Sequence, residues 1–148
     1  MGDLVPVDRT TVVLSIRPVY ADRILAGTKT IEFRRKPLPS MVSTVLIWRA
    51  GPSGGVVGKF RLEHPEESHR AGWFAVEQSD GSRIIQPEAG VSAEDLIAYA
   101  GGEFGHLWAL GVRDATRYQQ TDRLGWSRGP QSWQYAPADW RTVLEVAW

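Results

Sequence analysis

The stretch Gly27-Thr28-Lys29-Thr30-Ile31-Glu32-Phe33-Arg34 contains the features that decide the fold. A glycine often follows the last turn of a helix, because it adopts the left-handed backbone conformation without a steric penalty. Polar and apolar residues then alternate from 28 to 35, which is typical of a strand with one buried face. Glu32 and Arg34 share a face of this strand and can pair, while Lys29 extends from the turn that precedes the strand. The stretch therefore predicts a helix end, a turn and a charged strand.

The residues before this stretch predict a strand followed by a helix. The β-branched run from 12 to 16 has the composition of a buried strand. Pro18 stands where a helix tolerates proline best, in its first turn, and Gly27 marks the end of the helix. We expect the apolar stripe of this helix to consist of Val19, Ala21, Ile24 and Leu25.

The residues after it predict further strands and two more helices. Strands are expected over 42–50 and 56–62, joined as a hairpin by the glycine-rich turn between them. A helical turn within 65–73, a tight turn at Asp80-Gly81 and a helix over 92–99 with Ser92 as its N-cap come next. The remaining expectations are a strand over 106–112, extending as far as 118, a loop over 119–135, and a last helix after Pro137 with Trp140, Val143, Leu144 and Ala147 on one face.

The composition limits what kind of protein this is. A chain of 148 residues has the length of about one domain, and 43% apolar residues supply a core. Because cysteine is absent, disulfides, thiolate metal sites and cysteine nucleophiles are excluded, which fits a reducing cytoplasm. We read no secretory signal and no apolar run near the ~20 residues of a membrane span. We expect a cytoplasmic protein without a membrane partner.

The charges are divided unevenly along the chain. Net charge is zero, yet residues 1–61 hold ten basic and four acidic side chains, and the rest holds seven basic and thirteen acidic ones. Such an asymmetry indicates an anionic partner if the basic residues gather on one surface of the folded protein. It carries no such information if the charges of the two halves of the chain are interspersed on the surface. His64 and His69 lie in an acidic segment without a convincingly spaced third ligand, so no metal site and no cofactor are expected.

Four stretches in order resemble the ASCH superfamily, a group of PUA-related domains implicated in RNA metabolism. The first strand and helix start resemble its opening, and the motif G-x-K-x-x-E-x-R over 27–34 resembles its signature. Val56-Val57-Gly58-Lys59-Phe60 resembles its fourth strand, and Gly129-Pro130-Gln131-Ser132-Trp133-Gln134-Tyr135 resembles the tail of one branch. The resemblance implies an α+β fold, a small PUA-like β-barrel with flanking helices. It implies one domain over 1–148, with a core of about 11–135 and a C-terminal helix of about 138–147.

The resemblance also implies a cleft around the motif that holds RNA or a nucleotide-like ligand. Lysine and arginine can meet phosphate, a carboxylate can accept from an exocyclic amine or a ribose hydroxyl, and aromatic rings can stack on an unpaired base. A structural ion pair that closes the barrel mouth would explain the same charges. The expected ligand-binding residues are Ser15, Arg17, Tyr20, Lys29, Glu32, Arg34, Trp48, Gln131, Ser132 and Trp133.

Catalysis is a second expectation of the resemblance. Some members hydrolyse N4-acetylcytidine with a lysine, a threonine and a glutamate, and ribonuclease activity is associated with another. Lys29 matches that lysine, but Glu32 stands where the threonine falls, and Glu94 or Asp95 matches the glutamate only loosely. The catalytic residues are therefore unknown, with Lys29, Glu32 and Tyr20 as candidates for acid–base roles. A nucleic-acid-binding module is the first hypothesis, and a small hydrolase is the alternative.

Overall fold

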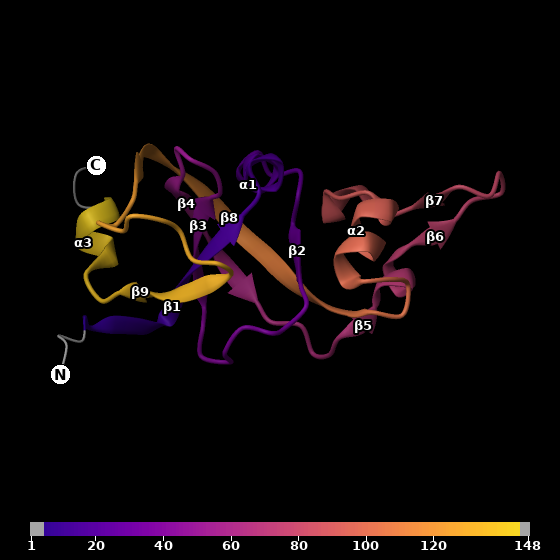
Figure 1. Ribbon diagram of the computed structural model, residues 1–148, viewed down its shortest axis with the longest axis horizontal. Coiled ribbons are helices and arrows are strands. Elements are labelled where there is room, and N and C mark those ends of the chain that lie inside the picture. The colour runs from indigo at the N-terminus through magenta and orange to yellow at the C-terminus, as the bar shows by residue number, and fades with distance from the viewer. Residues whose placement is uncertain (1–4, 146–148) are drawn as a thin grey trace.

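The computed structural model describes residues 5–145 (Figure 1). Its helices are α1 (Pro18–Leu25), α2 (Ala93–Ala100) and α3 (Trp140–Glu145), and its 3-10 turns are η1 (Ala71–Phe74) and η2 (Pro87–Ala89). Its strands are β1 (Val7–Ile16), β2 (Ile31–Arg34), β3 (Thr44–Arg49), β4 (Gly55–Glu63), β5 (His69–Arg70), β6 (Val76–Glu77), β7 (Arg83–Ile84), β8 (His106–Asp122) and β9 (Trp133–Pro137). The mixed α+β class is confirmed.

One sheet with the order β2-β8-β4-β3-β1-β9 forms the body of the molecule, and β5 adds to the end of β8. β1 and β3 run parallel, while the other neighbours are antiparallel. The expectation of a closed barrel is not met, because within residues 5–145 no ladder of hydrogen bonds joins β2 to β9. Instead, the sheet curls, and register shifts in β3–β4 and β4–β8 provide the bends that such curvature needs.

The main core lies between α1 and the curled sheet. Ala21 and Ile24 of α1 pack on buried aliphatic side chains of β1, β3 and β4. The expected stripe of α1 is wrong at Val19, which is exposed because it points away from the sheet. A second cluster lies beneath α3, where Trp140 is fully buried.

The C-terminal part of the chain differs most from the sequence-based expectation. Residues 119–122 continue β8, and β9 begins at Trp133, so the expected loop over 119–135 is shorter. These strand residues are polar because one face of this part of the sheet meets solvent, a pattern easily taken for a loop. Val143 of α3 is exposed rather than part of the apolar stripe, and Ala147 lies outside the described residues.

Residues 64–105 form a lobe at the end of the molecule opposite to α3 (Figure 1). Pairing of β5 with β8 and a third apolar cluster, which includes Phe33 of β2 and Leu96 of α2, hold this lobe on the sheet. The expected N-cap is present, since the Ser92 side chain accepts a hydrogen bond from the Asp95 amide. The lobe brings α2 opposite β2. No helix in the described part of the chain is long and apolar enough to cross a membrane.

Candidate functional site

A cleft of about 540 Å³ lies where the end of β1, the start of α1, β2 and α2 meet. Its size suits one nucleotide-sized ligand, since small-molecule sites commonly measure roughly 300–1,000 Å³. The described residues that line it include four cationic side chains (Arg17, Lys29, Arg34, Arg35), two carboxylates (Glu32, Asp95) and two tyrosines (Tyr20, Tyr99). This set favours an anionic ligand with a flat ring.

The turn between α1 and β2 places Lys29 inside the protein. Gly27 has a φ of +83°, a left-handed conformation that ends the helix. The amides of Thr28 and Lys29 then both donate to the Arg23 carbonyl, at 3.0 and 3.2 Å. The helix thus ends in a tight turn, and Lys29 lies in this turn, two residues before β2 begins.

Lys29 is almost completely buried, with 2% of its surface exposed. Its Nζ donates to the Ala89 carbonyl at 2.7 Å and lies 3.8 Å from Glu32 Oε1. Gly90 packs so closely on the Lys29 stem that a Cβ there would lie 2.6 Å from Lys29 Cβ. Burial lowers the pKa of Lys29; the Glu32 carboxylate opposes this effect, and nearby Arg23 adds to it. The lysine is therefore held in place by the last residue of η2 and by the glycine that follows it.

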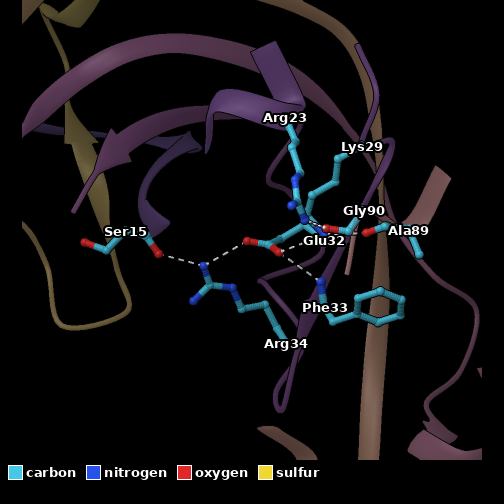
Figure 2. A network of polar contacts seen from close by, with 8 residues as sticks. All are labelled: Ser15, Arg23, Lys29, Glu32, Phe33, Arg34, Ala89 and Gly90. Atoms are coloured by element: carbon cyan, nitrogen blue, oxygen red, sulfur yellow. Dashed lines mark hydrogen bonds and ion pairs between the residues drawn. The ribbon is translucent and has the colours of Figure 1, made fainter. Parts of the chain in front are cut away.

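Glu32 connects the two cations of the motif, as Figure 2 shows. Its Oε2 accepts from Arg34 Nη2 at 3.2 Å, and its Oε1 accepts from the Phe33 amide at 3.1 Å. Arg34 Nη2 also donates to the Ser15 carbonyl at 2.7 Å, which ties β2 to β1 across the cleft. We call Lys29, Glu32 and Arg34 the cleft trio.

One hydrogen-bond donor of the cleft trio has no partner within the described residues. Within the described residues, Arg34 Nε is buried without a hydrogen-bond partner. A buried donor of this kind costs roughly 1–3 kcal/mol if nothing pairs with it. Arg17 and Arg35 are exposed at the rim, where they remain accessible to an anion.

Two tyrosines provide flat surfaces in the cleft. The Tyr20 ring lies 5.2 Å from Lys29 Nζ, and the Tyr99 ring lies 4.8 Å from the Arg35 guanidinium. Burial raises the pKa of Tyr20, and the negative charge of Asp95 raises it further. Tyr20 therefore stays a neutral phenol at neutral pH, suited to stacking or to donating a hydrogen bond.

The structure brings six of the ten expected ligand-binding residues together in the cleft: Ser15, Arg17, Tyr20, Lys29, Glu32 and Arg34. Trp48 lies elsewhere, because its ring is buried in the second apolar cluster and stacks on Trp126. In this position it offers no face to a base.

Gln131, Ser132 and Trp133 do not line the cleft, but their loop is tied to its wall. The Ser15 hydroxyl donates to the Pro130 carbonyl at 2.5 Å, and the Ser15 amide donates to the Ser132 carbonyl at 2.9 Å. Gln131 and Ser132 are exposed, whereas Trp133 is half-buried against the main core and meets Tyr135 edge to face.

The sequence reasoning missed Arg35 and Tyr99 as cleft residues. Tyr99 belongs to α2, about seventy residues from the motif in the chain, and no local pattern places α2 opposite β2. Asp95, one of the two candidates for the distant carboxylate, lines the cleft, whereas Glu94 is not among the described lining residues. The weak signal that existed was the capping pattern of this helix.

Comparisons with known proteins agree with this architecture. The ASCH domain family matches residues 14–123. A protein named ASCH domain-containing ribonuclease from Zymomonas mobilis subsp. mobilis is 40% identical over 57 residues, which is 38% of this chain and 38% of that protein. The match therefore spans well under two thirds of that relative's length.

Solved structures extend the similarity over most of the chain. The crystal structure of ASCH from Zymomonas mobilis is 26% identical and covers 89% of this chain and 91% of its own, with a TM-score of 0.69. A serine-to-alanine variant of that protein is 25% identical and covers 93% of this chain and 95% of its own, with a TM-score of 0.70. These neighbours support a PUA-like fold for this chain, whose own sheet does not close into a barrel within the described residues. By its sequence match and its architecture, the chain belongs to the ASCH domain family.

Proposed function

We propose that this protein binds RNA and holds one unpaired nucleotide in the cleft around Lys29, Glu32 and Arg34. The observation that carries the proposal is the cleft itself, in which four cations, two carboxylates and two tyrosines surround about 540 Å³. A relative named ribonuclease supports RNA as the ligand class. We expect the protein to act in the cytoplasm as one domain, without a cofactor.

Several groups in the cleft suit particular parts of a nucleotide. Arg17 and Arg35 at the rim are placed to meet phosphate oxygens, because arginine donates to phosphate in a planar, bidentate fashion. Glu32 accepts from an exocyclic amine or a ribose hydroxyl. Tyr20 or Tyr99 stacks on the base.

The loop tied to Ser15 is a proposed edge of the same site. Gln131 and Ser132 are exposed beside the Ser15 wall, where their side chains can reach the sugar or the phosphate. Trp133 would have to turn away from Tyr135 to stack on a base. Trp48 has no role in this proposal.

Titration of a labelled single-stranded RNA by fluorescence anisotropy tests binding. Arg34→Ala and Arg35→Ala should each weaken binding by about tenfold, and affinity should fall as salt rises. Arg141→Ala is the control, because Arg141 lies exposed on α3, at the other end of the molecule (Figure 1). RNA binding that is absent at low salt, or that responds equally to all three changes, would contradict the proposal.

A ribonuclease is the second candidate, favoured by the named activity of the relative. Burial lowers the pKa of Lys29, the direction that an acid–base group requires, whereas the raised pKa of Tyr20 keeps its phenol a neutral hydrogen-bond donor. Hydrolysis of N4-acetylcytidine is expected to be weak or absent, because Glu32 replaces the threonine hydroxyl. Incubation of the parent protein and a Glu32→Gln variant with RNA and with N4-acetylcytidine distinguishes a binding protein from a hydrolase. Turnover of either substrate by the parent that the variant abolishes would make the protein a hydrolase.

A further inference from the structure

A second surface with aromatic and cationic side chains lies on the lobe, apart from the cleft. Its rings belong to His69, Trp73, Phe74 and Phe104, and its guanidinium groups belong to Arg70 and Arg83; we call this set the outer aromatic surface. A hollow of about 480 Å³ opens between Trp73 and Phe104, with both arginines in its wall. Nothing in the proposed function uses these residues.

The backbone fixes the two walls of this hollow against each other. The amides of Ala71 and Gly72 donate to the carbonyls of Gly105 and Glu103, at 2.8 and 2.9 Å. Pairing of β5 with the start of β8 continues the contact. The segments that carry Trp73 and Phe104 therefore lie side by side, although thirty residues separate them in the chain.

Trp73 is held in a defined orientation and is still 66% exposed. Its ring stacks on His69 with centroids 4.0 Å apart and planes at 11°, and the Phe74 ring meets its edge at 5.0 Å. One face of the indole is therefore covered and the other is open to solvent. A ring already fixed in this way loses little conformational entropy when a second ring stacks on it.

Charge distinguishes the two hollows that Trp73 lines. In the first hollow, Arg70 lies over the Phe104 ring at 5.4 Å, and Arg83 pairs with Glu103. A second hollow, of about 510 Å³, contains Glu66 and Glu67, and no arginine or lysine among its described lining residues. Although residues 64–105 together hold eight acidic and two basic side chains, the basic ones both line the first hollow, so a phosphate group finds its cationic partners there and not in the second hollow.

We infer that the outer aromatic surface stacks an unpaired base of a single-stranded polynucleotide in the hollow between Trp73 and Phe104, with Arg70 and Arg83 against its phosphates. Stacking on an exposed ring beside arginines is the usual means of binding single strands without a sequence preference. Two ring contacts, Phe33 with Phe74 and Phe74 with Trp73, each with centroids 5.0 Å apart, lie between the cleft and this surface. The two sites therefore lie on neighbouring parts of the molecule.

Binding of a mononucleotide and of a single-stranded RNA of about ten nucleotides tests this inference, because the site sizes of single-strand binders reach roughly 4–16 nucleotides. Trp73→Ala should weaken oligonucleotide binding about tenfold and leave mononucleotide binding unchanged, while Trp73→Phe keeps most of the affinity. The oligonucleotide should also quench tryptophan fluorescence in the parent protein more than in Trp73→Phe. Met41→Ala is the matched control, since Met41 is equally exposed on a different part of the surface.

The outcomes separate this inference from the proposed function. Oligonucleotide binding that is unaffected by both Trp73→Ala and Phe104→Ala would overturn it. A change in oligomeric state of Trp73→Ala on analytical ultracentrifugation, without a change in RNA binding, would overturn it in favour of a protein-docking surface. If Arg34→Ala leaves mononucleotide binding unchanged while the oligonucleotide still quenches Trp73, the cleft proposal fails and this inference stands.

Discussion

Two sets of ion pairs in this protein use the same side-chain chemistry and differ in burial. In the cleft trio, Glu32 is 8% exposed and its partners Lys29 and Arg34 are 2% and 15% exposed. On the outside of the sheet, Arg61 and Asp114 pair at 3.0 Å and are 66% and 74% exposed. An exposed pair contributes little, whereas buried charges depend on one another because water does not solvate them. The difference predicts that the three groups of the trio depend on one another for stability, whereas the surface pair contributes little.

Removal of the carboxylate from each set should give the largest contrast. Glu32→Ala leaves two cations without their anion in the cleft and should lower the free energy of unfolding by about 3–5 kcal/mol. Asp114→Asn should change it by less than about 1 kcal/mol, because solvent screens the remaining arginine and asparagine tolerates the φ of +53° at this position. Urea unfolding followed by circular dichroism measures both variants. Equal losses would show that burial does not distinguish the two sets.

The packing that buries Lys29 provides the next test. Gly90 has a φ of +63° and Lys29 side-chain atoms within 2.6–2.9 Å of the position that a Cβ would take. Gly90→Ala should therefore cost about 2–4 kcal/mol, combining backbone strain with a clash. Gly81→Ala is the control, with a φ of +86° and open space around it, and should cost only about 1–2 kcal/mol of strain. If the two variants unfold at the same urea concentration, close packing of Gly90 on Lys29 does not contribute to stability.

The pH dependence of Lys29 should be the smallest effect. Because burial lowers the pKa of Lys29 below its ordinary 10.5, the unfolded chain binds this proton more readily than the folded chain at alkaline pH. The contribution of Lys29 to stability therefore rises as the pH approaches 10.5 from neutrality. The free energy of unfolding of the parent should increase relative to Lys29→Met between about pH 8 and about pH 10. Lys36→Met, at an exposed position, controls for the loss of a lysine, and a gap that stays constant or reverses with pH would contradict the burial effect.

Local patterns predicted those parts of the fold that depend on few residues. The glycine that ends α1, the strand at β2 and the Ser92 cap each depend on one turn or one strand, and the structure has all three. The expected single buried face of β2 is wrong, because Glu32 and Phe33 are both buried although they point to opposite faces. The polar end of β8 was taken for a loop, because a strand with a solvated face lacks the apolar alternation on which the prediction relied.

Contacts between distant segments were beyond these patterns. Trp48 was expected to face a ligand, but Gly54 and Gly129 approach its indole so closely that the ring is enclosed. Tyr99 and Arg35 meet only because the lobe folds α2 over β2. Such placements depend on tertiary packing between elements that no short stretch of sequence encodes.

The central claim is that a nucleotide occupies the cleft between β2, α1 and α2. Backbone amide chemical shifts of the labelled protein, recorded by NMR while a mononucleotide is added, test it most directly. The account predicts the largest shifts within 15–20, 29–35 and 91–101, the segments that line the cleft. Shifts confined to exposed arginines of the sheet or to α3, with those three segments unmoved, would contradict it.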